Sequence, residues 1–391
     1  MKKRLLFAFG CSLVPVAVWA VYAPIPEQDQ GKAVSVRLGS SVYHDSNIFG
    51  SATGAVSSMV YNVSPTINYN GSLTDQTFAS LGYQLSYDHI VDRPGKQNLS
   101  SHTFTGRLAH AFNSTTSIDF NELYQISKNP QSLLAGIPLN TNQSLKLNQF
   151  DMRFNTSLGA KTGVVFKYRH MVYSFDAASL ALLLDRREQL GGLEVDFALL
   201  PATKLVGEYR YQDISYDNSG TLKNKRSHFL LAGFNHNPGQ QVLLSARVGM
   251  EDRSREGATD ATVPYAELSA RYTYSEGSFF SGGYIYTLEE ASDVIRYTDS
   301  RLHRVFANVQ HRLSGPFTVS ASLSYESAEL QGRGVTVDLA ERTTRLGLAL
   351  SWQPVRQWTF TATYDLDRIA SADANRDQKR NRVGVAARLS L

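Results

Sequence analysis

The sequence predicts an all-β fold, a closed transmembrane antiparallel β-barrel of about 18 strands. Three observations lead to this fold class. The final stretch, 381–391, alternates strictly between apolar and polar residues. Turn-forming residues recur roughly every forty residues along the chain. The alternating segments between them run to about ten residues, the length that a tilted strand needs to cross a membrane.

The C-terminal stretch is expected to be the last strand and to close the barrel. Its apolar face consists of Val383, Val385, Ala387, Leu389 and Leu391, and polar or small residues alternate with them. A strand at the end of a chain leaves an open, apolar edge that invites aggregation. Pairing with the first strand removes that edge, so we expect the first and last strands to lie side by side.

The connections follow a pattern of short turns and longer loops. Eight tight turns are expected near 70–75, 113–116, 159–162, 201–203, 237–240, 275–278, 314–316 and 354–357. Nine polar loops are expected at 44–54, 90–98, 128–144, 176–185, 216–224, 253–262, 291–299, 329–340 and 370–377. An even number of strands, with short periplasmic turns and longer extracellular loops, is typical of barrels in the outer membrane of a Gram-negative bacterium.

The N-terminus is typical of an export signal. Residues 1–20 combine a basic start, an apolar core and a small-residue cleavage site, and they are expected to be removed. Residues 21–32 then form a periplasmic leader and 33–391 the barrel. Removal takes away three basic residues and Cys11, so the net charge of +4 falls to +1 and no thiol remains. Disulfides and thiolate chemistry are therefore excluded for the mature chain.

If the apolar face meets lipid, the opposite face lines a lumen that eighteen strands leave wide enough for water. Basic residues on that face outnumber acidic ones slightly, which favours anions. The alternative is that the charges pair across strands and only keep the lumen wet. The residues expected to contact ions or polysaccharide are Arg107, Arg153, Lys167, Arg169, Lys204, Arg210, Arg247, Arg271, Arg304, Arg312, Arg345, Arg382 and Arg388.

Two of the expected outer loops, 128–144 and 176–185, are rich in leucine. Apolar loop residues are costly in water, so these loops either pack on each other or fold into the mouth as a constriction. The residues expected to form the constriction are Leu180, Leu182, Leu183 and Leu184.

The sequence does not predict an enzyme, a metal site or a cofactor site. It contains no nucleophile elbow and no His-Glu-x-x-His motif. His303 and His311 lie on the apolar parity of one strand, where histidines near the interfaces usually belong to the aromatic belt. Nucleic-acid binding is not expected, because the basic residues are spread over many strands.

The segment after the first strand, Asp45-Ser46-Asn47-Ile48-Phe49, resembles the β-barrel porin 2 group of outer-membrane proteins, whose members occur with exopolysaccharide synthesis and export systems. The resemblance implies a passive channel for an exopolysaccharide, with outer-membrane lipid, the barrel-assembly machinery and a polysaccharide synthesis and export complex as partners. Such families commonly end in an aromatic residue, whereas this chain ends in Leu391. From the residues alone, Asp45 and Asn47 suit an Asx-type turn.

Two alternatives to polysaccharide export stay open. A general diffusion porin would differ only in its solute. A plugged barrel acting as a surface adhesin or scaffold would carry no current and would bind a partner through its loops.

Overall fold

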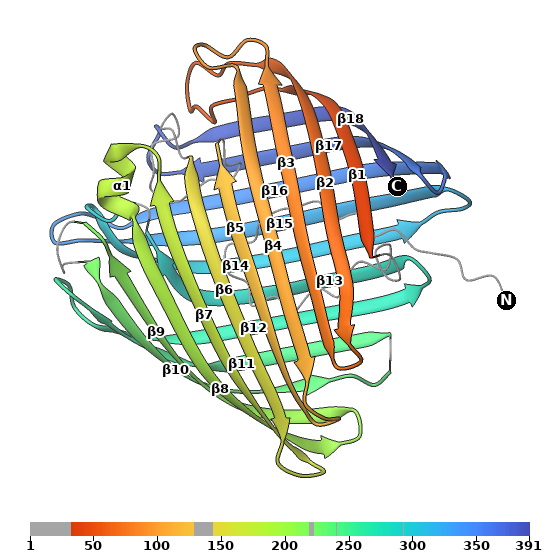
Figure 1. The fold of residues 1–391 in the computed structure, drawn as a ribbon. Coiled ribbons are helices and arrows are strands. Elements are labelled where there is room, and N and C mark those ends of the chain that lie inside the picture. Colours follow the sequence, from red (N-terminus) through yellow and green to blue (C-terminus); the bar gives the residue numbers. More distant parts are fainter. Residues whose placement is uncertain (1–32, 129–143, 219–222, 240, 292) are drawn as a thin grey trace.

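The computed structural model describes residues 33–128, 144–218, 223–239, 241–291 and 293–391. These residues form one 18-stranded antiparallel sheet in which each strand pairs with its neighbours in sequence. The pairing of β1 with β18 closes the sheet into a barrel (Figure 1). The fold class and the strand number predicted from the sequence are confirmed. The expected signal peptide, the leader and most of the 128–144 loop lie outside the described residues.

The connections lie close to where the turn pattern predicts them, although strands extend into the expected turn at 70–75 and into the expected loops at 253–262 and 291–299. Every expected tight turn and longer loop joins two strands of the barrel. The strands are β1 (Val34–Asp45), β2 (Ser58–Thr74), β3 (Thr77–Ile90), β4 (Asn98–Ala111), β5 (Thr116–Ser127), β6 (Leu145–Ser157), β7 (Thr162–Phe175), β8 (Arg186–Leu200), β9 (Thr203–Tyr216), β10 (Lys225–His236), β11 (Val242–Arg255), β12 (Ala261–Ser275), β13 (Ser278–Glu290), β14 (Tyr297–Arg312), β15 (Phe317–Gly332), β16 (Leu339–Val355), β17 (Trp358–Ser371) and β18 (Gln378–Ser390).

The seam between β1 and β18 is paired along most of its length. The register runs from Arg37 opposite Ser390 to Asp45 opposite Arg382. Beyond the last strand, the amide of Leu391 donates to the carbonyl oxygen of Val36 at 2.9 Å. The two edges that an open sheet would expose therefore satisfy each other.

The outer face of the barrel is a band of exposed apolar side chains. Leu81, Leu230 and Val385 are 63%, 72% and 63% exposed, and each alternates with polar residues of the opposite face. No water-soluble protein needs so continuous an apolar exterior, whereas a barrel in lipid requires it. The closed sheet and this band place the protein in the outer membrane.

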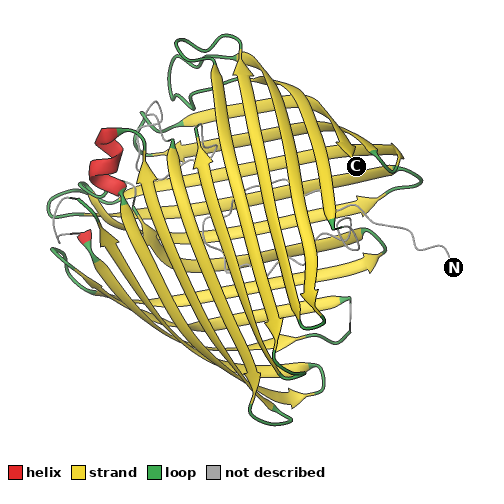
Figure 2. Cartoon of the chain, in the orientation of Figure 1, coloured by secondary structure: helices red, strands yellow, loops and turns green. Residues whose placement is uncertain are grey.

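One extracellular connection contains a helix, α1 (Ala178–Leu184), in a segment expected from its sequence to be a loop. Leu180 and Leu184, one helical turn apart, are its buried residues. Figure 2 shows α1 at the end of the barrel that carries the long loops. Among the described residues, no helix is long and apolar enough to span a membrane.

Candidate functional site: the lumen

Two regions of the inner face of the barrel differ in their chemistry. On β7–β14 the inner face carries densely paired charges, and we call this the charged wall. On β2–β5 its middle rows carry hydroxyl and amide groups, and we call this the neutral wall. Half of the eighteen-strand circuit separates β3 from β12, so the walls lie on opposite sides of the lumen (Figure 1).

At mid-height the charged wall holds an ion network, the mid-wall cluster, that spans β7 to β12. Lys167 contacts Glu194 at 2.6 Å and Glu208 at 2.9 Å. Arg210 binds Glu208 through two nitrogens, and Arg247 lies 3.4 Å from Glu194. Glu267, 3.6 Å from Arg210, completes a set of three cations and three carboxylates. The cluster is therefore neutral as a whole, and its charges are held by one another.

Nearer the extracellular end, the charged wall holds a second network, the mouth cluster. Its centre is Asp299, which is fully buried and lies 3.0, 2.6 and 2.6 Å from nitrogens of Lys225, Arg253 and Arg255. Arg253 also binds the fully buried Glu251. The remaining carboxylate, that of Glu290, contacts Lys225 and Arg253 and accepts a hydrogen bond from the hydroxyl of Tyr216. These contacts join β9, β10 and β11 to the tip of the β13–β14 hairpin.

This hairpin tip leans over the lumen. Glu290 and Asp299 face each other across the hairpin, and both reach inward to cations on strands three or four places away. A register shift between Tyr297 and Ser300 in the β14–β15 pairing accompanies this departure from regular alternation. The mouth is consequently narrowed on the side of the charged wall.

The neutral wall has no charged side chain in its middle rows, which lie entirely within described strands. Thr66, Gln84, Thr103 and Gln125 form one cross-strand row, and Asn68, Gly82 and Thr105 belong to the next. The nearest charges are Asp88 toward the mouth, Arg107 toward the periplasm and Arg37 beside Thr66 on β1. Gln84 and Thr105 are exposed although they lie at mid-height on the inner face. Side chains of the described residues therefore leave these two positions uncovered on the inner face.

The strand register places all thirteen basic residues predicted from the sequence on the inner face. Nine of them lie within 4 Å of a carboxylate. Such pairing is what the second interpretation of the sequence predicted, in which the charges bind one another and only keep the lumen wet. Arg271 stacks on the ring of Phe279 at 4.2 Å, and Arg153 donates to Asn155. Contact of these residues with a passing solute stays a prediction. The nine paired residues are Arg107, Lys167, Arg169, Lys204, Arg210, Arg247, Arg304, Arg345 and Arg382.

The sequence prediction missed the mouth cluster. Residues 253–262 and 291–299 were expected to be loops, but β11 continues to Arg255 and β14 begins at Tyr297. The alternation of Glu251, Arg253 and Arg255 with outward residues was the available indication that the strand goes on.

Apolar residues of the α1 segment pack against inner-face residues at the mouth. Leu180 and Leu184 join an apolar cluster with inner-face residues of β6, β7 and β9 and with Val294 of the β13–β14 connection. Leu183 is partly buried against this cluster, whereas Leu182 is 57% exposed. Whether the segment restricts passage stays a prediction.

Polar contacts hold α1 at both sides. Asp185 follows the helix and accepts a hydrogen bond from the amide of Phe175 at 2.7 Å. Burial raises the pKa of the Asp185 carboxyl, while that hydrogen bond lowers it. Lys223 donates to the carbonyl oxygen of Leu183 at 3.1 Å, and burial and the nearby Arg333 lower the pKa of its ammonium group.

The segment that carries the family resemblance has a structural role here. The amide of Asn47 donates to Asp45 Oδ1 at 3.0 Å, which is the expected Asx-type turn. Asp45 also accepts two hydrogen bonds of 3.0 Å from Nε of Arg380 on β18, across the seam. Ile48 packs with inner-face residues of β2–β4, so this loop covers the mouth on the side of the neutral wall.

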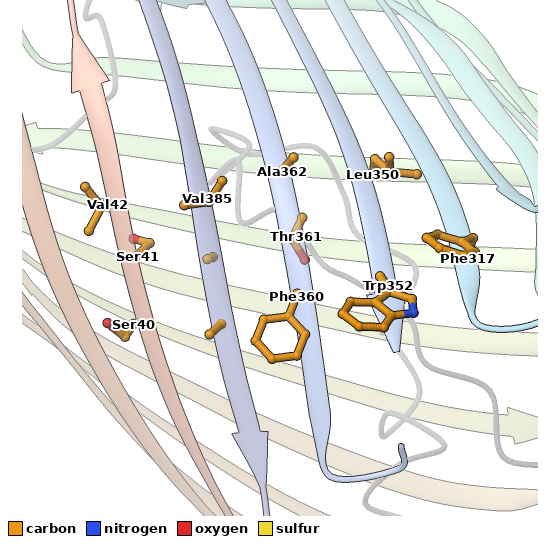
Figure 3. A pocket seen from close by; sticks show the side chains of 12 residues that line it. Ser40, Ser41, Val42, Phe317, Leu350, Trp352, Phe360, Thr361, Ala362 and Val385 are labelled. Carbon is orange, nitrogen blue, oxygen red and sulfur yellow. The ribbon is translucent and has the colours of Figure 1, made fainter. Parts of the chain in front are cut away.

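The outer face offers a shallow groove, but it belongs to the lipid side. Figure 3 shows Ser40, Val42, Val385 and Ala362 beside the rings of Phe360, Trp352 and Phe317. These residues form two adjacent rows across β1, β18, β17, β16 and β15 on the apolar parity. Small side chains in the middle of the rows leave the hollow, which lies on the lipid side of the wall and apart from the lumen.

The histidines noted in the sequence also lie on the outer face. His303 Nδ1 is 2.8 Å from the hydroxyl of Tyr284, and His311 Nδ1 is 3.0 Å from that of Tyr274. Tyr209 and His228 make the same contact at 2.8 Å. These tyrosine–histidine pairs are consistent with the expected position of the histidines in the aromatic belt at the membrane interface.

Comparison with known proteins adds little beyond the architecture. No protein-family model matches the chain, and no curated protein matches it. Among solved structures, the barrel is similar to OccAB4 of Acinetobacter baumannii (TM-score 0.48, 11% identity, 92% of this chain and 98% of that one). It is similar to the outer-membrane protein OpdK of Pseudomonas aeruginosa (0.47, 12%, 92% and 99%) and to the siderophore receptor PirA of the same organism (0.43, 9%, 91% and 80%). Because these TM-scores are below 0.5, the assignment of the fold depends on the strand pairing and not on the similar structures.

Proposed function

We propose that this protein is a passive outer-membrane channel for small polar solutes. The observation that carries the proposal is the exposure of Gln84 and Thr105 at mid-height on the inner face, inside a closed barrel. Eighteen strands enclose more space than inner side chains fill, and polar groups on both walls keep that space hydrated. Weak contacts at many positions would let a solute enter and leave again.

The loops make the channel selective by size. The α1 segment, the β13–β14 hairpin and the loop after β1 all pack against inner-face residues at the extracellular end. A solute reaching the neutral wall has to pass between them. A channel of moderate conductance, smaller than an unobstructed barrel of this size would have, is the expected result.

Planar-bilayer recording of the refolded protein in KCl tests this proposal. Steady single-channel conductance, stable at both signs of voltage, is expected. A protein that inserts, shows the heat-dependent gel shift of a folded barrel and carries no current would contradict the channel and favour the plugged adhesin or scaffold.

Export of a secreted polysaccharide is the second candidate function. The resemblance of residues 45–49 favours it, and the hydroxyl and amide groups of the neutral wall suit a sugar chain. An anionic polysaccharide added to the bilayer separates the candidates. Reversible block by the polymer supports export, whereas indifference to the polymer with open conductance supports the general channel.

A further inference from the structure

We infer that the neutral wall is a binding strip for uncharged polyhydroxylated solutes, such as a short neutral oligosaccharide. The inference rests on the proposed channel and names the solute class that one of its walls recognises. It depends on three observations: the charge-free rows of β2–β5, the close approach of two polar side chains over Gly82, and the separation of these rows from the charged wall.

The first observation is the chemistry of the rows. Thr66, Gln84, Thr103 and Gln125 place four groups, each able to donate and to accept hydrogen bonds, side by side over β2–β5. Adjacent strands lie about 4.8 Å apart, so the row spans about 14 Å, the length of a small oligosaccharide. A sugar hydroxyl also donates and accepts, and such a row can replace its water at every position.

The second observation is the close approach of two polar side chains over Gly82. Gly82 lies between Asn68 and Thr105, and a Cβ atom built on it would approach Asn68 Oδ1 to 2.8 Å and Thr105 Oγ1 to 2.4 Å. The two oxygens therefore converge over the glycine. Any side chain at this position would displace them, so glycine allows the Asn68 amide and the Thr105 hydroxyl to lie close together on the wall.

The third observation is that the strip lies apart from the charged wall, with Arg37 as a basic neighbour at its β1 edge. Inner-face cations and carboxylates of the charged wall are bound to each other in the mid-wall cluster, on the far side of the lumen. An ion over the β3–β5 part of the strip meets no charged group in these two rows in return for its lost hydration. A neutral polyol loses no charge solvation there, and its hydroxyls keep their hydrogen bonds. The strip consequently discriminates against ions and in favour of polyols.

Removal of the hydroxyls without a change of volume tests the inference. The variant Thr66→Val/Thr103→Val/Thr105→Val keeps the pore size and uses a residue that strands favour. Maltohexaose is added to wild-type channels in KCl, and the block of single-channel current is measured. The wild type is expected to be blocked reversibly, and the triple variant to need roughly tenfold more sugar for the same block, because three neutral hydrogen bonds are lost. Its KCl conductance should equal that of the wild type.

Two further variants separate recognition from damage. Gly82→Ala displaces the Asn68 and Thr105 side chains and is expected to weaken the block severalfold. Gly192→Ala, on the inner face of the charged wall where the added Cβ has no neighbour closer than 3.6 Å, should leave the block unchanged. Thr363→Val, an inner-face position on β17 outside the strip, should also leave it unchanged.

The outcomes distinguish this inference from the proposed function. Absence of KCl conductance in a folded, inserted barrel would overturn the channel itself. Normal conductance with no block by maltohexaose, or with equal block of the wild type and the triple variant, would overturn the binding strip alone. Stronger block by gluconate than by maltohexaose would also overturn it, since the strip should prefer the uncharged solute.

Discussion

The two walls of the lumen are built from the same strand alternation, yet they use their inner faces differently. On the charged wall, inner positions carry buried charges that pair with one another, such as Asp299 with Lys225, Arg253 and Arg255. The neutral wall leaves Gln84 and Thr105 exposed to the lumen. The comparison teaches that charge density inside a barrel is a poor guide to where a solute binds. On the charged wall, the charged side chains bind one another and narrow the mouth. On the neutral wall, polar groups stay exposed to a solute in the lumen.

The largest effect is expected from Asp299→Asn on the charged wall. The substitution leaves Lys225, Arg253 and Arg255 buried with less compensating charge, and breaking a buried ion pair typically costs about 3–5 kcal/mol. Denaturant unfolding in lipid vesicles, followed by tryptophan fluorescence, measures the loss. Glu329→Gln, which removes a half-exposed ion pair with Arg301, is the control and should change the free energy of unfolding by less than about 1 kcal/mol. Equal effects for both variants would mean that the mouth cluster is not a structural element.

The next effect concerns α1, which covers the mouth beside the charged wall. Leu184 is 2% exposed within the apolar cluster, so Leu184→Ala should weaken the docking of the helix by about 2–3 kcal/mol. Single-channel conductance is expected to rise, and deletion of 177–184 should raise it further. Leu182→Ala, at the exposed position of the same helix, is the matched control. Unchanged conductance in the deletion would remove the idea of a constriction.

A smaller effect is expected when the mid-wall cluster loses one carboxylate. Glu194→Gln leaves three cations against two carboxylates, but Lys167 and Arg247 both keep Glu208. The free energy of unfolding should fall by about 1–3 kcal/mol. The reversal potential in a KCl gradient should shift toward anions. A shift toward cations would contradict the position of this cluster on the lumen.

The smallest change in stability is expected on the neutral wall. Gln84→Glu adds a carboxylate at an exposed inner position, so the free energy of unfolding should stay within about 0.5 kcal/mol. The same variant should shift the reversal potential toward cations and weaken the block by maltohexaose. Stability loss as large as that of Asp299→Asn would show that the two walls do not differ in the way described.

Much of the fold was predictable from the sequence because strand alternation and turn residues are local properties. The eighteen strands, the closure of β18 on β1 and the inner position of the basic residues all follow from period two. The exact ends of the strands could not be predicted in this way. For that reason the sequence did not predict the mouth cluster, which lies at strand ends. Asp299 and Lys225 are 74 positions apart and meet only because the hairpin tip leans inward. Long-range tertiary contacts of this kind leave no local periodicity.

For the candidate site, the sequence predicted only which residues of each strand face inward. The sequence drew attention to the arginines, because charge is conspicuous, and passed over Thr66, Gln84 and Thr103, which stand in one row only after two strand pairs are aligned. The convergence of Asn68 and Thr105 over Gly82 requires coordinates. The helix of α1 was also missed, since a seven-residue helix rests on its docking rather than on its own propensity.

The hydrogen bond from the amide of Leu391 to the carbonyl oxygen of Val36 holds the end of the last strand beside the start of the first. Because the last strand ends beside the first at the periplasmic rim, the order of strands has no privileged starting point. A gene that joined 391 to 33 through a short linker and opened the chain in the turn at 201–202 would encode the same set of strand pairs. Such a circular permutant should close into the same ring with the same register, and only the last pair to zip would move, from β1–β18 to β8–β9.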